Sequence, residues 1–372
     1  MLFDFDGEVL TLATGNGFGR CQYKFGIQDA ECAPFRVAVK ASEINQVCSV
    51  VRSDSLNLSH VGNQLHIVGD KGHFKLACTE DFPEMPAVPS ESVAELSAAE
   101  LVHAMRATSP AVDENSEKFA LGGVQLCIYE DGSAAMYATD GRRASMVTIG
   151  GASDSVVKEK FLIPQQAVPM ISGMLGKSDG DTVSVYRDGT AIVLTIGGGI
   201  VLVTELAGRF PDVNALISGT FDRKRKSSMS VNVAELKSAI REATIGYDGN
   251  SEWANGVNIA CDGGRLIVLS DAASANDIEA TVAAADIDGT GCMTIDYAFL
   301  SSAASASGDD SVRIALVPMN NNGIAMTIEG QSYRGLIMGI TMTVDDGKGK
   351  QVPTANALRC LKAMESGQLA LV

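Results

Sequence analysis

The chain has 372 residues, of which 46% are hydrophobic and 20% charged, so it is long enough for two or three domains with buried cores. Its formal net charge of −16 argues against a protein that wraps nucleic acid over its whole surface, although a local basic face remains possible. The sequence contains no run of about 18 apolar residues and no basic leader before an apolar run. We therefore expect a cytoplasmic protein that does not enter a membrane.

The eight cysteines form no C-x-x-C pair, and no Cys/His cluster has the spacing of a zinc site. Buried thiols in a reducing cytoplasm explain such a distribution. We expect no bound metal and no cofactor.

The first elements along the chain are a hairpin and a helix. Asp6-Gly7 lies between two apolar runs, as a hairpin turn would, and the second run ends at a hydroxyl, Thr14. Ser42 is placed to cap a helix with apolar residues at i, i+3, i+4 and i+7, namely Ile44, Val47, Cys48 and Val51. Asp54 in "SDSLNL" opens a further strand, and "DFPEMP" at 81–86 is typical of a linker.

The middle of the chain follows the same plan, with an additional helix in front. Ser97-x-x-Glu100 resembles a capping box and predicts that helix. A turn at Asp131-Gly132 and a strand ending at Thr139 follow. Pro164 stands where a first helical residue would, before the apolar residues Val168, Ile171 and Leu175. A strand after Asp181 and the linker "RFPDVN" at 209–214 complete this part.

The last part repeats the plan again. Asn232-x-x-Glu235 predicts a helix whose buried face comprises Leu236, Ala239, Ile240 and Ala243. A turn at Asp262-Gly263 and a strand ending at Ser270 come next. Asp296 is placed to cap a helix bearing Phe299, Leu300 and Ala303, and Asp310 opens a strand. In the remaining residues, "TANALRCLKAMESG" at 354–367 predicts a short amphipathic helix, either an appended element or a regulator that covers a binding cleft.

The equal spacing of these features identifies an internal repeat. From the closing hydroxyl to the Asp that opens the later strand there are 40, 42 and 40 residues. The sequence therefore predicts an α+β protein of three tandem domains, 1–85, 86–212 and 213–342, with a C-terminal extension at 343–372. Relative to the other two, the first domain lacks its opening helix, a difference of some 30 to 40 residues.

Three segments within this repeat, "ATDGRR", "FLIPQQAV" and "LAGRFPDV", carry a family resemblance. With the repeat they make the sequence similar to the bacterial DNA polymerase III beta subunit, the sliding clamp family, up to about Met342. The resemblance implies three DNA-clamp domains per protomer, with antiparallel sheets outside and helices lining a central hole. It also implies a non-catalytic processivity factor, a ring-shaped homodimer that encircles double-stranded DNA without reading its sequence and needs no cofactor.

The resemblance further implies a hydrophobic cleft that binds short motifs of the polymerase III alpha subunit, the clamp loader and other clamp-binding proteins. Carried over by position, this cleft comprises Leu121, Thr139, Gly141, Arg142, Arg143, Ala144, Pro211, Leu216, Phe299, Met338, Gly339 and Ile340. The family usually ends its last strand with Met-Pro-Met or Met-Pro-Leu, where this chain has Met338-Gly339-Ile340. We expect the cleft to be retained, and the sequence leaves its motif preference open.

Basic residues on the inner helices would attract phosphate groups without sequence specificity. The residues expected to face DNA are Arg106, Lys237, Arg241, Arg52, Lys118 and Lys177. The resemblance also implies that the first domain of one protomer pairs with the third domain of its partner. Phe74, Ile245 and Tyr247 are the residues expected at that interface.

Two alternatives remain open. An enzyme would need a nucleotide or metal site, but "TGNGFGR" at 14–20 lacks the G-x-G-x-x-G spacing, and the four histidines have no nucleophile at a recognisable distance. Asp181 and Asp310 occupy equivalent turn positions of the repeat, as structural residues do. The second alternative is a scaffold protein with the clamp fold that no longer encircles DNA.

Overall fold

The computed structural model describes residues 1–27, 32–84, 87–116, 120–177, 181–245, 256–262, 264–270, 278–320, 323–340, 343–345 and 351–353. Its contacts divide the chain into two compact units. Unit 1 comprises Met1–Val102 and Gln166–Leu206, and unit 2 comprises His103–Gln165 and Ala207–Val372.

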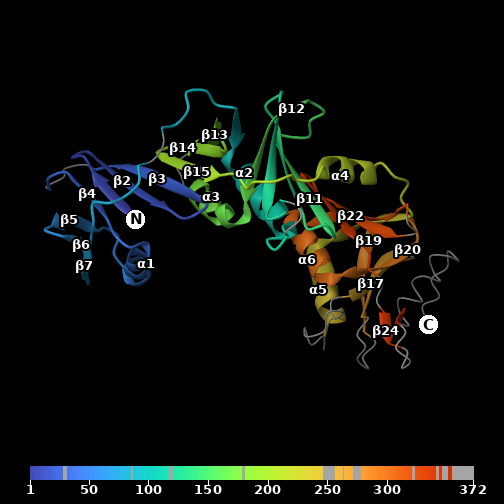
Figure 1. Cartoon of the computed structure of the whole chain (residues 1–372). Helices are drawn as coiled ribbons and strands as arrows, with labels where there is room; N and C mark the ends of the chain where they lie inside the picture. The colour runs from blue at the N-terminus through green and yellow to red at the C-terminus, as the bar shows by residue number, and fades with distance from the viewer. Residues whose placement is uncertain are drawn as a thin grey trace. The chain divides into compact units, whose positions relative to one another are not determined.

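Unit 1 contains an eight-stranded antiparallel sheet in the order β4-β1-β2-β3-β15-β14-β13-β8 and a three-stranded sheet in the order β5-β6-β7 (Figure 1). The strands of the larger sheet are β1 Leu2–Phe5, β2 Val9–Gly15, β3 Gly19–Gly26, β4 Phe35–Ala38, β8 Ala94–Ser97, β13 Thr182–Asp188, β14 Ala191–Ile196 and β15 Gly199–Thr204. Those of the smaller sheet are β5 Asn57–Val61, β6 Gln64–Val68 and β7 His73–Ala77. The helices are α1 Ala41–Val50 and α3 Val168–Leu175.

Unit 2 contains a twelve-stranded antiparallel sheet in the order β12-β9-β10-β11-β23-β22-β21-β16-β19-β18-β17-β20. Its strands are β9 Gly123–Tyr129, β10 Ala134–Thr139, β11 Arg143–Ile149, β12 Val157–Pro164, β16 Ser227–Asn232, β17 Gly256–Asp262, β18 Arg265–Ser270, β19 Glu279–Gly289, β20 Gly291–Asp296, β21 Ser311–Pro318, β22 Ile324–Glu329 and β23 Tyr333–Met338. Two short strands, β24 Thr343–Asp345 and β25 Gln351–Pro353, pair with each other.

Unit 2 also contains α4 Val213–Phe221, α5 Val233–Ala243 and α6 Tyr297–Ala306. α5 packs against α6, and α4 packs against β10, β11 and β23 (Figure 1). α2 Ala98–Thr108 begins in unit 1 and ends in unit 2, where the 3-10 turn η1 Ser109–Ala111 follows it.

The order of the elements confirms the internal repeat. Strands β1-β2-β3-β4, helix α1 and strands β5-β6-β7 have counterparts in β9-β10-β11-β12, α3 and β13-β14-β15, and again in β17-β18-β19-β20, α6 and β21-β22-β23. Within the sheets the first four strands of each repeat lie in the same order, β4-β1-β2-β3, β12-β9-β10-β11 and β20-β17-β18-β19. β8-α2 and β16-α5 precede the second and third repeats.

The sheets run across the predicted domain boundaries. β3 pairs with β15 in unit 1, and β11 pairs with β23 in unit 2, so each sheet joins strands of two repeats. The contacts therefore cluster into two units, and the division at 85, 212 and 342 stays a prediction.

The predicted hairpin turns are confirmed at the two positions that lie within the described residues. Gly7 and Gly132 have φ of 113° and 86°, values that glycine adopts at little cost. Asp6 Oδ1 accepts the backbone N–H groups of Glu8 and Val9, at 2.9 and 2.7 Å. Gly263 of the third turn lies outside the described residues.

The capping predictions are confirmed for the helices of the third repeat. Asn232 Oδ1 accepts the N–H groups of Ala234 and Glu235, and Asp296 Oδ1 accepts those of Ala298 and Phe299. All four residues predicted to form the apolar face of α5 are buried. In α2, the Ser97 hydroxyl accepts the Glu100 N–H at 3.4 Å.

Two predicted helix starts are wrong. α1 begins at Ala41, so Ser42 lies inside the helix, and Lys40 at the N-cap makes no side-chain cap. Pro164 is the last residue of β12, and the 3-10 turn η2 Gln165–Ala167 separates it from α3. A strand partner across the sheet therefore outweighs the local preference of proline for a first helical turn.

The expectation of buried thiols holds only in part, because two of the free cysteines, Cys127 and Cys261, are buried, whereas Cys48 is exposed and Cys21, Cys32 and Cys78 are half-buried. Six cysteines of the described residues are free, and burial raises the pKa of Cys127 and of Cys261 to about 11. Cys292 is disulfide-bonded, so the expectation of a free thiol is wrong at that position.

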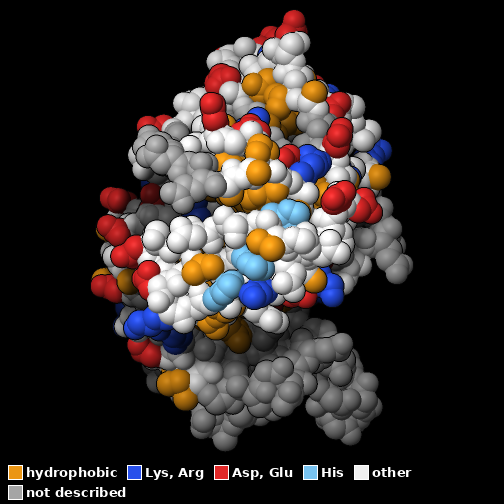
Figure 2. Space-filling view, turned by 90° about the vertical axis from the view of Figure 1, so that its left-hand side faces the viewer, with side chains coloured by type: hydrophobic (Ala, Val, Ile, Leu, Met, Phe, Trp, Pro, Cys, Tyr) orange, Lys and Arg blue, Asp and Glu red, His pale blue; other side chains and the backbone are white. Residues whose placement is uncertain are grey.

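The smaller sheet of unit 1 carries three histidines, His60, His66 and His73. The rings of His66 and His73 are 5.2 Å apart, and burial, then Lys75 and His73, lower the pKa of His66. Figure 2 shows histidine side chains among hydrophobic ones in the middle of the face that it presents.

Candidate functional site

The turn between β10 and β11, in the "ATDGRR" segment, is held by hydrogen bonds. Asp140 Oδ1 accepts the N–H groups of Arg142 and Arg143, both at 2.9 Å. The Thr139 hydroxyl donates to the Arg143 carbonyl at 2.6 Å and accepts the Gly141 N–H at 3.1 Å. Gly141 has a φ of 85°, in the region that favours glycine. The turn is thus a rigid structural element.

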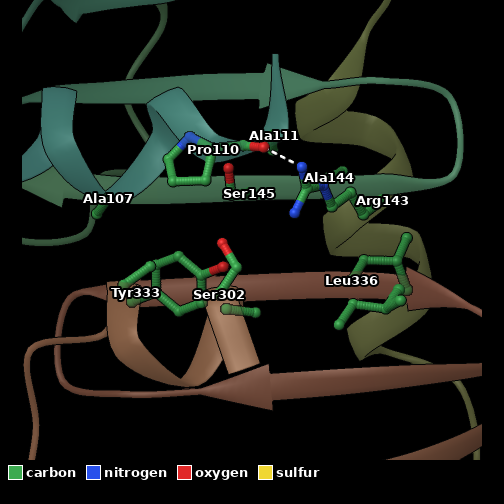
Figure 3. A pocket seen from close by; sticks show the side chains of 12 residues that line it. Ala107, Pro110, Ala111, Arg143, Ala144, Ser145, Ser302, Tyr333 and Leu336 are labelled. Atoms are coloured by element: carbon green, nitrogen blue, oxygen red, sulfur yellow. Dashed lines mark hydrogen bonds between the residues drawn. The ribbon is translucent and has the colours of Figure 1, made fainter. Parts of the chain in front are cut away.

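Arg143 braces the turn against two other elements. Its Nε lies 2.9 Å from Asp140 Oδ2, in an ion pair whose side chains are 16% and 14% exposed. Its guanidinium also donates to the Pro110 carbonyl of η1 (Figure 3) and lies 4.1 Å from the ring centroid of Phe299 on α6. Such a cation–π contact and a sheltered ion pair stabilise the packing of β11 on η1 and α6.

The sheet formed by β10, β11 and β23 has two different faces. Successive residues of a strand point to opposite faces, so Ala144 points away from the side of Arg143. Ala144 packs with Val213 and Ile217 of α4. We call the side of the sheet that carries Ala144 and α4 the α4 face. The opposite side, which carries Arg143 and packs against η1 and α6, is called the helix face. The buried cluster of the α4 face comprises Cys127, Tyr129, Ala135, Tyr137, Ala144, Val213, Ile217, Ala325 and Leu336.

Several residues of the predicted cleft border this cluster. Met338 packs against it and is half-buried, while Leu216 on α4 is 45% exposed and Ile340 is 37% exposed. Pro211 is half-buried in the linker before α4, and Asp212 Oδ1 caps α4 by accepting the Ala215 N–H at 3.0 Å. These residues leave apolar side chains at the surface of the α4 face.

Other predicted cleft residues have structural positions. Leu121, Thr139 and Ala144 are 7%, 5% and 2% exposed, so they support the α4 face from beneath. The Ala120 N–H donates to the Arg209 carbonyl at 3.4 Å and holds the linker beside the segment of Leu121. Arg142 and Gly141 are exposed. Arg143 and Phe299 lie on the helix face, so the structure does not bring them to the α4 face.

The end of β23 is fixed by three backbone hydrogen bonds. The N–H groups of Met338, Gly339 and Ile340 donate to the carbonyls of Arg142, Ile324 and Thr294, each at 2.9 Å. A Cβ atom on Gly339 would lie 2.8 Å from the Ile324 oxygen. Proline, the residue usual in the family, lacks the N–H that this position donates. Glycine is therefore required by the local packing.

The sequence analysis missed α4 and two buried tyrosines. Asp212 followed by Val213, Ile217 and Phe221 is a cap with an i, i+4, i+8 pattern, a signal that could have identified the helix. The hydroxyl groups of Tyr129 and Tyr137 are 2.8 Å apart beneath it, and burial is the main cause of the raised pKa of both. No pattern in the sequence indicates this long-range pair.

Two hollows in the structure differ from the predicted cleft. A crevice on the helix face, between η1, β11, α6 and β23, encloses about 10 Å³, room for roughly one water molecule (Figure 3). A polar hollow of about 390 Å³ lies in unit 1 over β1, β2 and β3, beside the Arg36–Asp4 ion pair at 2.6 Å. Neither hollow provides a deep apolar pocket.

The residues predicted to face DNA lie on or just after helices. Arg106 on α2 and Arg241 on α5 are exposed, Lys237 is half-buried, and Arg241 Nε donates to the Lys237 carbonyl at 3.3 Å. Arg52 follows α1 and donates to the carbonyls of Ser49 and Val51. Lys177 is exposed after α3, and Lys118 lies outside the described residues.

The helices themselves are close to neutral. Helices α1 to α6 contain three basic residues, Arg106, Lys237 and Arg241, and four acidic residues, Glu43, Glu100, Glu235 and Glu242. The described helices therefore carry no strongly basic face.

The residues predicted for the dimer interface are only partly accessible. Phe74 on β7 is half-buried and packs against the unit 1 core of Phe3, Val37, Ile44 and their neighbours. Ile245 is 61% exposed, and Tyr247 lies outside the described residues, as does the helix predicted at 354–367.

Among the residues that the structure describes, no three His, Cys, Asp or Glu side chains are grouped to hold a metal ion. In the same part of the chain, no helix is long and apolar enough to cross a membrane.

Replacing Arg143 with alanine removes the ion pair, the hydrogen bond to Pro110 and the contact with Phe299 together. We expect the free energy of unfolding to fall by about 2–3 kcal/mol in urea denaturation. The exposed neighbour Arg142→Ala is the matched control and should change it by less than about 0.5 kcal/mol. Equal effects of both changes would contradict the bracing role.

Replacing Gly339 with alanine forces a Cβ atom against the Ile324 carbonyl. The expected loss is about 1–3 kcal/mol of unfolding free energy, measured by thermal or urea denaturation. Gly219 in α4 has no atom within 4 Å of its would-be Cβ, so Gly219→Ala should instead stabilise the protein, by about 0.5–1 kcal/mol. An unchanged stability of Gly339→Ala would refute the packing argument.

No family model matches the chain. In sequence it is 24% identical to the beta sliding clamp of Synechococcus elongatus over 243 residues, 63% of either chain, and 24% identical to that of Chlamydia muridarum over 269 residues. The latter match covers 72% of this chain and 69% of the relative. The chain thus spans about two thirds of the length of the curated relatives it matches.

The fold matches solved clamps over most of the chain. DNA polymerase III subunit beta from Pseudomonas aeruginosa superposes with a TM-score of 0.75 at 17% identity, covering 91% of both chains. The beta subunit from Thermotoga maritima gives 0.77 at 15% identity, covering 91% of this chain and 90% of that one. The Helicobacter pylori beta clamp, solved with a DNA ligase peptide, gives 0.72 at 17%. By distant sequence similarity the chain is a relative of the beta sliding clamps, and it has their α+β clamp fold.

Proposed function

We propose that the protein is a cytoplasmic DNA sliding clamp, a head-to-tail homodimer that closes around duplex DNA and tethers polymerases and repair proteins. The observation that carries this proposal is the pairing of repeats through equivalent strands. A closed ring retains DNA by topology, so it needs neither a catalytic group nor strong contacts with the bases.

The two junctions within one chain indicate how a third would form. β3 of the first repeat pairs with β15, the last strand of the second, and β11 of the second pairs with β23, the last strand of the third. By the same rule, β19 of the third repeat would pair with β7, the last strand of a first repeat. A second copy of the chain supplies that strand, and two such pairings close a ring of six repeats.

The strands left over are suitable for this pairing. In the described residues, β7 pairs only with β6, and Glu279–Ala283 of β19 pair only with β18. His73 and Lys75 are exposed on β7, and Glu279 is exposed on β19. Free backbone edges of opposite charge favour antiparallel association between two copies.

The nearly neutral helices are compatible with sliding. A few exposed cations, Arg106 and Arg241 among them, give diffuse contacts with phosphate, while the net charge of −16 limits binding elsewhere. Weak contacts inside a closed ring allow movement along the duplex.

The α4 face is the proposed docking surface for partner motifs. Leu216, Met338 and Ile340 offer apolar contacts beside the rigid turn that carries Arg142. An extended peptide with one or two apolar anchors and an acidic group would fit this combination. The ligase peptide bound to the Helicobacter pylori clamp supports a peptide-binding role.

A scaffold that has the clamp fold but does not encircle DNA is the second candidate. The balance of basic and acidic residues on the helices favours it, since it leaves the inner layer without a net positive charge.

Retention on DNA distinguishes the two candidates. We expect the protein, once placed on nicked circular DNA, to stay bound in a gel-filtration assay and to dissociate after the circle is cut. The retention should change little with salt, because topology rather than charge holds the ring. Failure to remain on circles, with a monomeric mass in solution, would favour the scaffold.

The docking surface is tested by Leu216→Asp, a change at an exposed position. Binding of a labelled clamp-binding peptide from the polymerase alpha subunit should weaken at least about tenfold in fluorescence anisotropy, because an apolar contact is lost. Met338→Asp should act in the same direction. Val156→Asp, at a residue 68% exposed elsewhere in unit 2, is the control and should bind normally. Full affinity of Leu216→Asp would exclude the α4 face.

A further inference from the structure

The three-stranded sheet of unit 1 has one face on the core and one outer face. Leu65 and Ile67 of β6 are 0% and 4% exposed and belong to the core that contains Phe3 and Val37. Because successive residues of a strand point to opposite faces, His66 lies on the outer face. β5, β6 and β7 lie at the left of Figure 1, the side that Figure 2 presents, and Figure 2 shows histidine side chains at that surface.

The strand register brings two histidines together on this outer face. Between β6 and β7, His66 stands opposite Lys75, and Val68 stands opposite His73. His66 and His73 are thus diagonal neighbours on adjacent strands, a position from which aromatic side chains reach each other. Their ring centroids are 5.2 Å apart, and the angle between the rings is 70°. His66 is half-buried, and His73 is exposed.

The hairpin that joins β6 to β7 fixes the positions from which these rings project. The Gly69 N–H donates to the Gly72 carbonyl at 2.9 Å across the turn. The Asp70 N–H donates to the Ser53 hydroxyl at 2.8 Å, and a Cβ atom on Gly69 would lie 2.5 Å from that oxygen. Two side chains held on paired strands by an anchored turn need little ordering when they bind a common ligand.

The separation of the rings suits a single metal ion between them. An imidazole nitrogen binds zinc at about 2 Å, which places the ion about 3 Å from the ring centroid. Two imidazoles at a tetrahedral angle on one ion then have centroids about 5 Å apart. The observed separation is 5.2 Å. One ion therefore fits between His66 and His73, once each ring turns a nitrogen toward it, without any change in strand register.

We propose that His66 and His73 form a two-imidazole site for a transition-metal dication of the zinc class. Imidazole suits zinc, copper and nickel, whereas magnesium and calcium prefer oxygen ligands. Water completes the coordination, since within the described residues no third His, Cys, Asp or Glu side chain joins these two in a group. The bound ion links β6 to β7 and stabilises the small sheet.

The neighbours on the outer face set the properties of this site. Ser59 of β5 stands opposite His66, where its hydroxyl can hydrogen-bond a water molecule on the ion. Burial, then Lys75 and His73, lower the pKa of His66, so protons compete less with an ion for its nitrogen. The exposed ammonium group of Lys75 also repels a dication. The site therefore binds zinc less tightly with Lys75 than without it.

His60 provides a matched comparison within the same sheet. It stands opposite Leu65, so it projects toward the core side, where its ring centroid lies 6.0 Å from that of Phe35. Its side chain is exposed, as that of His73 is, but among the described residues no second imidazole ring contacts it. His60 can thus report on zinc bound by a single imidazole.

The test is calorimetric titration of the complete chain with zinc chloride at neutral pH. Free thiols also bind zinc, so the readout is the difference between variants. We expect His66→Ala and His73→Ala each to weaken one zinc equivalent at least about tenfold. The double variant should lose no more than either single one, because both nitrogens hold the same ion. His60→Ala should bind as the unaltered chain does, and magnesium chloride should give no binding.

Two further measurements make the test specific to this site. Lys75→Ala should tighten zinc binding about two- to tenfold, because a positive charge beside the ion is removed. Zinc should slow amide hydrogen exchange at residues 64–77 in the unaltered chain and not in His73→Ala, a variant at an exposed position that does not threaten folding.

The proposal is overturned if His66→Ala and His73→Ala bind as many zinc ions, as tightly, as the unaltered chain. Losses that add in the double variant would also overturn it, since they would mean two separate ions. So would an equal effect of His60→Ala, because a single imidazole would then suffice. None of these outcomes depends on whether the protein encircles DNA.

Discussion

Pairing of strands between repeats is the constraint on which the rest of the structure depends. β3 with β15, and β11 with β23, are antiparallel ladders that convert separate α+β repeats into continuous sheets. Each ladder satisfies the backbone groups of two strands that would otherwise be edges. In the described residues β5 and β7 each pair only with β6, and residues 279–283 of β19 pair only with β18.

The second ladder also separates two faces of unit 2, the α4 face and the helix face. Because β11 and β23 alternate their side chains, one side of the sheet receives Ala144, Leu336 and Met338 beneath α4, and the other receives Arg143 against η1 and α6. The proposed docking surface and the Arg143 brace therefore occupy opposite faces of the same two strands. The rigidity of the turn at Asp140 serves both, since it fixes where β11 begins.

The charge on the described helices does not favour tight binding of nucleic acid. The net charge of −16 is spread over a chain whose helices contain nearly equal numbers of basic and acidic residues. Tight phosphate binding would slow movement along a duplex and would need a larger basic surface. Exposed apolar groups are instead concentrated at defined places, Leu216 and Ile340 in unit 2 and Leu56, Phe25 and Ile27 in unit 1.

The sequence by itself determined the features that depend on neighbours a few residues away. The hairpin turns at Gly7 and Gly132, the caps at Asn232 and Asp296, the buried stripe of α5 and the threefold spacing were all predictable, because local hydrogen bonds and periodicity govern them. Only the tertiary structure decided which side of β11 Arg143 occupies and why position 339 needs glycine. These outcomes depend on strand partners far away in the chain, and a shift of one residue in register reverses the face of every side chain.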